Sequence, residues 1–320
     1  MSSGSSSPKI CVVIPVYEDY PVLKECLHAL ERQSLNYKDF EVLVVDNGTP
    51  ADDFEDPRSY GHQMNLRLVR EPKAGSYAAR NAGIRGSESE FLAFTDADCR
   101  PGKRWLEEGL DALRDPRTGL VAGRVVVTQE SEGTPNVVEL QRLRSAFPQK
   151  RYVEEKGFGA TANVFAKRSV FEEVGLFRAE LRSSGDKEWG RRVQAAGYDL
   201  SYSHDAVVTH RARATLRELI EKSIRTAIGS YQVSRIEQSE LRTQSKATSM
   251  WKIVGDIASD TVNGMRRLFR DPDLSFRQKV GVAVVSGIQQ VTFRVTQRLM
   301  AARELFGRGK AVGVDGPTRT

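Results

Sequence analysis

Cysteine is scarce in this chain of 320 residues, which has three, at positions 11, 26 and 99. An odd number without a Cys-x-x-Cys pair excludes a disulfide framework or a zinc ribbon and fits a reducing compartment. Long apolar runs are missing too, since the uncharged stretch Val280–Phe293 is too short and too polar to cross a membrane. The polar N-terminus lacks the apolar core of a signal peptide, so we predict a disordered segment over 1–9 and a cytoplasmic protein.

Glycine-rich phosphate loops are also missing from the sequence. No G-x-G-x-x-G follows the first strand-like segment, and G-x-x-x-x-G-K-[ST] occurs nowhere. The first pattern is typical of dinucleotide-binding domains and the second of P-loop enzymes. Both of these nucleotide-binding classes are therefore disfavoured.

Charge of one sign is concentrated in the last third of the chain. Residues 211–320 carry 20 Lys and Arg against 10 Asp and Glu, whereas residues 1–210 carry 28 against 32. Such an asymmetry indicates a basic region that meets an anionic partner: nucleic acid, a phospholipid surface or an acidic acceptor.

What the sequence does contain, over its first two hundred residues, is an alternation of strand-like and helix-like segments. Short apolar runs predict buried strands at Ile10–Val16, Glu41–Asp46, Asn65–Arg70, Glu90–Thr95 and Gly119–Thr128. Helical spacing lies between them at 20–33, 76–84 and 103–113. The alternation predicts an α/β fold with a largely parallel sheet and helices on both faces.

Beyond residue 211 the pattern changes to long helices. Apolar residues recur every three or four positions, with Lys and Arg between them, at 215–235, 251–270 and 276–306. The stretch 237–249 is predicted to be a linker and 310–320 a flexible tail. Between the tail and the disordered N-terminus we therefore expect an α/β domain over 10–211 and a basic amphipathic helical region over 212–309.

Ligands of parallel α/β sheets bind beyond the carboxyl ends of the strands. That rule places Tyr17, Asp46, Asp96 and Asp98 at one edge of the predicted sheet. Asp96 and Asp98 form a DxD pattern, in which two carboxylates converge on one cation where the strand turns. Mg²⁺ and Mn²⁺ prefer such oxygens together with substrate phosphates, although paired aspartates also cap helices and fill turns.

Four further residues each have two interpretations. Asp46 can accept an N–H from a nucleotide base or form an Asx turn with the residues that follow it. Arg80, in a helix of small residues, can bind a phosphate or remain on the surface. Asp186 is either a general base for an acceptor hydroxyl or a charge favoured at a helix start, and His210 either a ligand or a structural side chain.

Five segments in order resemble the inverting family 2 nucleotide-sugar glycosyltransferases, which have the GT-A fold. They are VVIPVY, VVDNGT, GSYAARNAGI, FTDADCRP and SSGDKEWGRRVQAAGY leading to VVTH. The resemblance covers about Ile10 to Arg211. It implies a GT-A type nucleotide-binding sheet flanked by helices, followed by the C-terminal helical region. It also implies sugar transfer with inversion from a nucleoside-diphosphate sugar, with UDP-sugars favoured.

The resemblance further implies a role for each matching residue. The nucleotide-binding residues are Pro15, Tyr17, Asp46, Arg80 and Asp96. The ligands of a Mn²⁺ or Mg²⁺ ion are Asp98 and His210, and the catalytic base is Asp186. The acceptor side comprises Asn163, Glu188 and Trp189, with the segment Gly159–Phe165 and Arg168. In one departure from the family pattern, Gly185 stands where a Glu precedes the base.

The acceptor that the resemblance implies is a glycan or a lipid-linked sugar, in cell-surface polysaccharide or glycolipid synthesis. The basic region favours peripheral attachment to an anionic membrane, at the inner face of the cell membrane, over binding of nucleic acid. A nucleotidyltransferase of similar architecture is the main alternative, but VYEDYPVL is acidic and has no glycine where such enzymes have a basic, glycine-rich loop. A non-catalytic protein that binds nucleotide sugars or nucleic acid is the other alternative.

Overall fold

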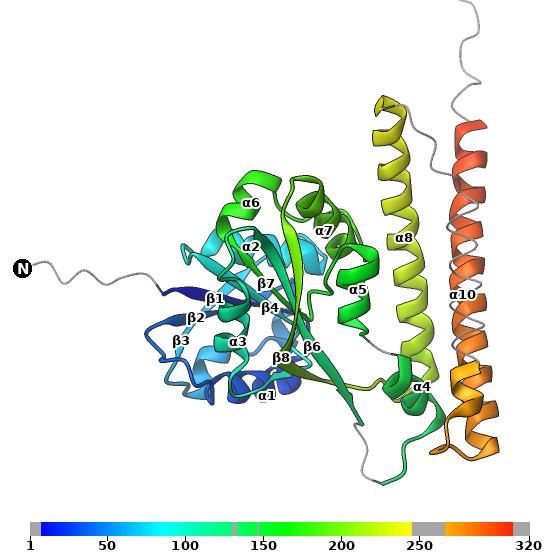
Figure 1. Ribbon diagram of the computed structural model, residues 1–320, viewed down its shortest axis with the longest axis horizontal. Coiled ribbons are helices and arrows are strands. Elements are labelled where there is room, and N and C mark those ends of the chain that lie inside the picture. Colours follow the sequence, from blue (N-terminus) through cyan, green and yellow to red (C-terminus); the bar gives the residue numbers. More distant parts are fainter. Residues whose placement is uncertain (1–7, 130–132, 146, 245–265, 310–320) are drawn as a thin grey trace, which may run out of the picture. The chain divides into compact units, whose positions relative to one another are not determined.

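The computed structural model describes residues 8–129, 133–145, 147–244 and 266–309. These residues divide into two compact units (Figure 1). Unit 1 consists of 8–129, 142–145 and 147–212, and unit 2 of 133–141, 213–244 and 266–309. The short segment 133–141 therefore joins the C-terminal helices, although the division expected from the sequence placed it in the α/β domain.

Unit 1 contains an eight-stranded sheet with the order β3-β2-β1-β4-β7-β6-β8-β5. Its strands are β1 Ile10–Val16, β2 Phe40–Asp46, β3 Asn65–Arg70, β4 Phe91–Thr95, β5 Cys99–Pro101, β6 Thr118–Thr128, β7 Asn163–Lys167 and β8 Asp199–Arg211. The predicted strands are all present, within one residue at either end. Continuous apolar runs form β1 and β2 because both faces of the sheet are covered there, and almost every residue of these two strands is buried.

The sheet is mixed rather than largely parallel, which corrects the expected arrangement. Strands β3, β2, β1 and β4 are parallel, as are β6 and β8. Strand β7 lies between these two groups and runs antiparallel to both β4 and β6, while β5 runs antiparallel to β8. Two helices, rather than a single crossover helix, lie between β6 and β7. The alternation of strands and helices along the sequence therefore did not predict that β7 runs antiparallel to its neighbours.

Helices flank this sheet in unit 1 (Figure 1). They are α1 Tyr20–Leu30, α2 Ser76–Gly86, α3 Trp105–Ala112, α5 Gln149–Lys156, α6 Arg168–Val174 and α7 Gly185–Ala195, with 3₁₀ turns η1 Ala51–Asp53 and η2 Pro57–Tyr60. The small residues of α2 allow the close approach that the sequence predicts. A Cβ at Gly83 would overlap the side chain of Val13 on β1, and one at Gly86 would lie 2.9 Å from Leu43 on β2.

Unit 2 is built on two long helices, α8 Leu216–Gln244 and α10 Phe276–Gly309, which lie side by side (Figure 1). Tyr231 and Arg235 of α8 both contact the carboxylate of Glu304 on α10. The start of α4 (Val137–Ser145) packs on α10, where Leu140 and Val282 share a small apolar cluster. Among the described helices, none combines the length and apolar character that a membrane span requires.

The predicted linker over 237–249 is wrong for its first part, because α8 continues to Gln244. Residues 236–244 contain no glycine or proline, and Glu, Gln, Leu and Arg in this stretch are good helix formers. The remainder of that prediction lies outside the described residues. So do residues 251–265 of the second predicted helix, residues 1–7 of the N-terminus and the tail over 310–320.

Candidate active site

Strand register brings the predicted site residues to one edge of the sheet. Val16 at the end of β1 pairs with Asp46 at the end of β2, and β4 runs parallel beside β1. Tyr17 and Asp96 follow directly after two of these strands. On the other side, Cys99 of β5 pairs with His210 of β8. The edge expected from the sequence is therefore present, and β5 and β8 add His210 to it.

Two of the predicted nucleotide-binding residues differ sharply in exposure. Tyr17 is 53% exposed, so its ring is available for contact with a ligand. Asp46 is fully buried, and its carboxylate accepts hydrogen bonds from Tyr20 Oη at 2.9 Å and from Arg70 Nε at 3.1 Å. The backbone N–H of Thr49 lies 3.4 Å from the same carboxylate. These contacts use three of about four acceptor positions and hold the turn after β2 in place.

Asp98 and His210 lie together, as a shared cation would require. His210 Nε2 is 3.3 Å from Asp98 Oδ2. His210 Nδ1 lies 2.6 Å from the carbonyl oxygen of Arg211, and because a carbonyl can only accept, Nδ1 is the donor of this hydrogen bond. The contact fixes the orientation of the ring, so that Nε2 faces Asp98, as the free nitrogen of a metal-ligating histidine would face its ion.

The thiol of Cys99 lies beside these two side chains, and the sequence did not indicate it as part of the site. Ligand atoms of Asp98, Cys99 and His210 all lie within 4.8 Å of one another. Burial raises the pKa of the Cys99 thiol well above its usual value, so the sulfur remains protonated. Hard cations prefer oxygen ligands, and the carboxylate and imidazole are the better candidates. The donor set therefore fits a Mn²⁺ or Mg²⁺ ion held with help from a substrate phosphate.

Arg80 is buried in α2 and forms an ion pair with Asp96. Its Nη1 also donates to the carbonyl oxygen of Ser76 at 3.3 Å, while its Nε has no partner among the described residues. Arg80 is thus not the surface residue of the alternative interpretation. A guanidinium at this position carries fixed positive charge at the carboxylate edge of the sheet.

Asp186 lies in the first turn of α7, where Ser184 turns the chain with a φ of 63°. Its Oδ1 accepts hydrogen bonds from Tyr77 Oη at 3.2 Å and from the backbone N–H of Lys187 at 2.9 Å. Burial raises the pKa of Asp186, and this outweighs the hydrogen bonds and the positive charge of Arg80, which lower it. A carboxylate with a raised pKa in a partly buried position is suited to accept a proton.

Helix α2 contacts both the predicted catalytic base and one of the predicted DxD carboxylates. Tyr77 and Arg80 are three residues apart and therefore lie on the same helix face. Tyr77 contacts Asp186, and Arg80 pairs with Asp96. Tyr77 was not among the residues expected from the sequence, although it is the one large side chain among the small residues that begin this helix.

Lys187 is a second basic group at the site that the sequence did not indicate. Burial, with the neighbouring charges of Arg191 and Lys156, lowers its pKa to about 8, and the charge of Asp186 opposes this shift. A lysine in this environment loses its proton far more readily than an exposed one.

The three residues expected on the acceptor side are held in the interior by other contacts. Asn163 is fully buried, accepts from the indole N–H of Trp105 and donates to the carbonyl oxygens of Arg124 and Ala206. Trp189 is also buried, stacked on Phe171. The structure therefore leaves Asn163 and Trp189 no exposed surface for an acceptor.

Glu188 is buried as well and pairs with Arg178 and Arg192 at 2.9 and 2.7 Å. Both of these arginines belong to the segment around α7, so the negative charge of Glu188 is compensated within the domain. The structure gives Glu188 a place in this buried ion-pair cluster, where its carboxylate orients α7 rather than facing a ligand.

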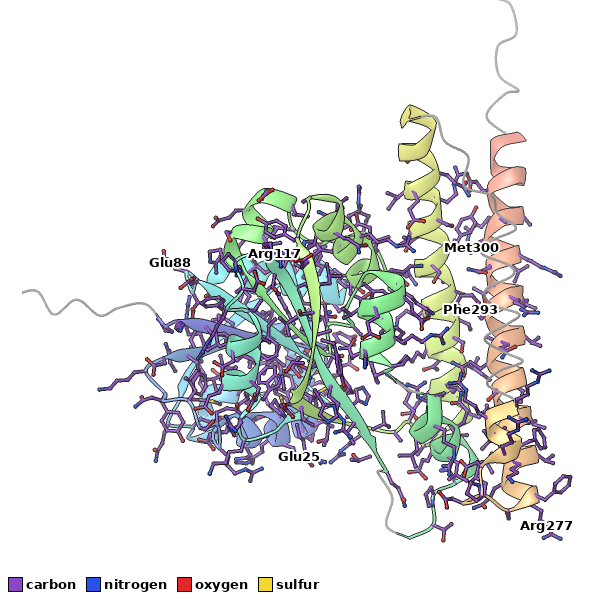
Figure 2. All side chains as sticks on the ribbon, viewed as in Figure 1. Glu25, Glu88, Arg117, Arg277, Phe293 and Met300 are labelled. Carbon is purple, nitrogen blue, oxygen red and sulfur yellow. The ribbon has the colours of Figure 1, made fainter. Side chains whose placement is uncertain are left out.

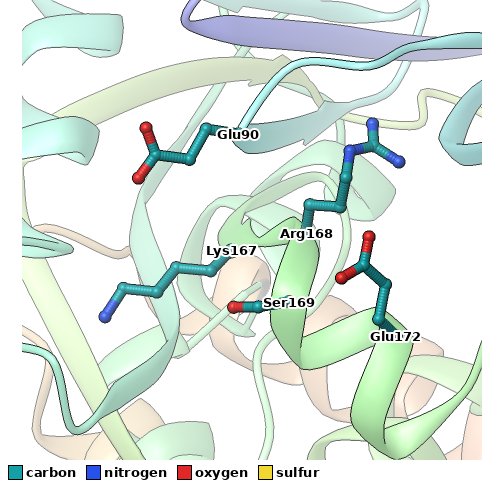
Figure 3. A pocket seen from close by; sticks show the side chains of 5 residues that line it. All are labelled: Glu90, Lys167, Arg168, Ser169 and Glu172. Atoms are coloured by element: carbon teal, nitrogen blue, oxygen red, sulfur yellow. The ribbon is translucent and has the colours of Figure 1, made fainter.

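A cavity of about 290 Å³ lies at the other edge of the sheet (Figure 3). Its lining includes Glu90, the residue before β4, and Lys167 at the end of β7. Lys167 pairs with Phe91, the first residue of β4. Arg168 also lines the cavity and donates to the carbonyl oxygens of Ser89 and Ile84. Because β7 is antiparallel, Arg168 lies far along the strands from Asp96, and its expected place on the acceptor side is wrong.

Comparison with known proteins gives a consistent picture. The sequence profile of glycosyl transferase family 2 matches residues 11–175. Glycosyltransferase AglE of Haloferax volcanii is 36% identical over 253 residues, which cover 78% of this chain and 82% of the relative. The pre-mycofactocin glycosyltransferase of Mycobacterium tuberculosis is 29% identical over 233 residues, covering 69% of this chain and 46% of that protein.

Solved structures support the fold. The mannosyltransferase PcManGT from Pyrobaculum calidifontis, in complex with GDP-Man and Mn²⁺, has a TM-score of 0.55 at 18% identity and covers 98% of this chain and 82% of that one. Residues 1–349 of S. aureus TarS, in complex with UDP-GlcNAc, have a TM-score of 0.52 at 14% identity over 92% of both chains. With the family profile spanning more than half of the sequence, the chain belongs to glycosyl transferase family 2 and is a glycosyltransferase with a GT-A fold.

Proposed function

We propose that this glycosyltransferase moves a sugar from a nucleoside-diphosphate sugar to an acceptor hydroxyl in a single displacement. The observation that carries the proposal is the double contact of α2, through Tyr77 to Asp186 and through Arg80 to Asp96. This supports the proposal, because one face of α2 contacts both the candidate base and one carboxylate of the candidate diphosphate site. Such an arrangement suits a reaction in which the leaving diphosphate and the attacking hydroxyl lie in line.

The nucleotide is expected at the ends of β1 and β2. Tyr17, two residues after Pro15, offers an exposed ring for stacking. Asp46 retains one acceptor position, and an N–H of the base would reach this buried carboxylate when the exposed side chain of Arg70 turns aside. Solved structures of similar fold contain GDP-Man or UDP-GlcNAc, which supports a nucleotide-sugar donor. We favour a UDP-sugar, because the uracil ring presents an N–H to a carboxylate in the position of Asp46.

Asp98 and His210 would hold a Mn²⁺ or Mg²⁺ ion with the donor diphosphate. A divalent cation at this point neutralises the charge that develops on the leaving nucleoside diphosphate. Arg80 forms an ion pair with Asp96, which holds that carboxylate in place and brings a positive charge to the site. The Mn²⁺ in the complex of PcManGT supports a divalent ion here.

Asp186 is the proposed general base. Its pKa is raised by burial, and Tyr77 holds the carboxylate in place through a hydrogen bond to Oδ1. Removal of the hydroxyl proton during direct attack on the anomeric carbon inverts that centre. An α-linked donor should therefore give a β-linked product, and a retained configuration in the NMR spectrum of the product would contradict the mechanism.

The donor site is tested by thermal unfolding with UDP-, GDP- and dTDP-sugars, each with and without Mn²⁺. A ligand that binds only the folded chain raises the unfolding temperature. We expect one nucleotide to give a shift that depends on Mn²⁺ and is lost in Asp98→Ala, whereas the exposed control Asp205→Ala should retain it. Absence of a shift with every donor, or a shift that Asp98→Ala retains in full, would contradict the proposed site.

For the acceptor we propose a glycan or a lipid-linked sugar, used in the synthesis of a cell-surface polysaccharide or glycolipid. The support comes from α10, which exposes six large apolar side chains by 41% to 73%. These are Phe276, Val280, Val284, Val291, Val295 and Leu299. We propose that this face attaches the enzyme peripherally to an anionic membrane, at the inner face of the cell membrane, where lipid-linked acceptors are found.

A further inference from the structure

A second group of metal-ligating side chains lies on α1, away from the carboxylates of the active site. His28 is in the last turn of α1, Glu31 follows the helix, and His62 is the second residue after η2. His28 and Glu31 are three residues apart and therefore share a helix face. Gly61, with a φ of 77°, turns the chain at the end of η2 and brings His62 to the same face.

The distances within the group suit a tetrahedral ion. His62 Nδ1 is 2.9 Å from Glu31 Oε1, and His28 Nδ1 is 3.4 Å from Glu31 Oε2. One ligand atom from each residue lies within 4.8 Å of the others. Ligands bound to Zn²⁺ at about 2.1 Å with tetrahedral angles are about 3.4 Å apart. A small rotation of the exposed His28 side chain is enough to complete this geometry.

The burial of His62 supports a ligand at this place. Its side chain is 2% exposed, and its ring contacts Glu31 through Nδ1, the nitrogen that faces the proposed ion. A buried imidazole whose inward nitrogen meets a carboxylate is already held in the orientation that a metal ligand needs. Glu31 is oriented from outside the group by the backbone N–H of Gln63 at 3.2 Å, as ligating carboxylates commonly are.

The group is distinct from the active-site carboxylates. Cys26, two residues before His28, directs its thiol to the carbonyl oxygen of Asp96 at 3.8 Å. Residues two apart on a helix point to different sides, so His28 faces away from that carbonyl. His28 is also about half exposed, which leaves the group open to ions from solvent.

We propose that His28, Glu31 and His62 bind a Zn²⁺ ion, with water in the fourth position. Two imidazoles and one carboxylate form a ligand set that zinc accepts in four-coordinate sites with one open position. The ion would connect the end of α1 to the segment that leads into β3, and it would stabilise the folded chain because the unfolded chain lacks the site. This site is independent of sugar transfer.

The test uses the full-length protein, stripped with a chelator, in the Asp98→Ala background, so that the active-site pair does not contribute. Calorimetric titration with Zn²⁺ is expected to give one ion per chain. Adding His28→Ala should weaken binding at least tenfold, and adding His62→Gln should do the same. Adding His204→Ala, which removes an exposed histidine elsewhere, should leave the affinity unchanged.

Two results would overturn the proposal. One is no binding of Zn²⁺ to folded Asp98→Ala protein. The other is equal affinity in the His28→Ala and His204→Ala variants. Since His28 is exposed, its replacement does not disturb the interior, and the comparison holds even if His62→Gln fails to fold. Donor binding by the wild-type chain is measured separately, so failure here leaves the proposed function untouched.

Discussion

Tyr77 occupies the space that a side chain at position 185 would need. A Cβ on Gly185 would lie 2.7 Å from the ring atom Cε2 of Tyr77. The ring is buried, and its hydroxyl donates to Asp186. This gives a physical reason for the departure from the family pattern at Gly185: in this chain the neighbour that orients the base comes from α2 instead of from the preceding residue.

The first prediction concerns the hydroxyl of Tyr77. Tyr77→Phe keeps the ring packing but removes a hydrogen bond to an ionised group, and the rate of transfer should fall about tenfold or more. This hydrogen bond lowers the pKa of Asp186, so its loss should raise that pKa and move the acidic limb of the pH–rate profile to higher pH. An unchanged acidic limb would show that Tyr77 has only a packing role.

The second prediction concerns Asp186 itself. Asp186→Asn should lower kcat by about 10²–10⁴-fold, the usual contribution of a general base. Burial raises the pKa of Asp186 in the folded state, so ionisation at neutral pH costs folding free energy. The variant should therefore be more stable than the wild type at neutral pH. The difference should vanish as the pH falls and the wild-type carboxyl takes up its proton.

Urea unfolding of both proteins at neutral and acid pH measures this difference. Asp205→Asn, at an exposed position, serves as the control and should show no such pH dependence. A stability difference for Asp186→Asn that is equal at both pH values would contradict the assigned cause, since burial of the charge would then contribute nothing.

For single residues, the sequence predicted those whose own side-chain type indicates a role, such as a carboxylate or an imidazole that can bind a metal. Asp98 and His210 were expected to meet, and they lie 3.3 Å apart. Tyr77 was missed because its role depends on a partner 109 residues away. Asn163 and Trp189 were placed on the acceptor side because sequence order alone does not show which way a side chain points in an irregular segment.

At the scale of elements, the contact of α2 with β1 determines where Tyr77 and Arg80 lie. The third prediction therefore uses Gly83, at which any Cβ overlaps Val13. Gly83→Ala should lower the free energy of unfolding by about 1–3 kcal/mol, as overpacking does. Because α2 must then shift from the sheet, the Mn²⁺-dependent donor shift should also weaken.

Gly287 in α10 is the matched control, since nothing lies within 4 Å of a Cβ built there. Gly287→Ala should raise the free energy of unfolding by about 0.5–1 kcal/mol through helix propensity alone. Equal effects of the two substitutions in urea unfolding would show that the close approach of α2 does not matter for stability.

The elements themselves were largely predictable because apolar periodicity reports burial directly. Strands β1 to β4 and β6 were expected at nearly their observed limits. Strands β5 and β7 were not expected. The antiparallel direction of β7 depends on how the intervening chain returns to the sheet, which periodicity does not report. The end of α8 was also misplaced, since a polar helix and a polar linker have similar compositions.

At the scale of the whole molecule, part of the excess of Lys and Arg in the last third of the sequence lies on α10. The six exposed apolar side chains are spaced by four or seven residues and so form one stripe along the helix. Arg277, Arg294 and Arg298 are exposed on the same side, and Figure 2 shows side chains projecting along α10. An amphipathic helix with arginines beside its apolar stripe is typical of a surface that lies on an anionic membrane.

The fourth prediction tests this stripe by flotation of the full-length protein with vesicles. Vesicles with anionic lipid should carry the protein upward, and neutral vesicles should do so much less. Each arginine near the surface contributes about 1 kcal/mol, so binding should weaken steeply as salt is added. Val291→Asp, in the centre of the stripe, should abolish flotation. Gln238→Asp, which adds the same charge at an exposed position of α8, should reduce it only slightly. If the wild-type chain stays with the soluble fraction, or if both variants float equally well, the stripe has no role at the membrane, and the acceptor must reach the enzyme from solution.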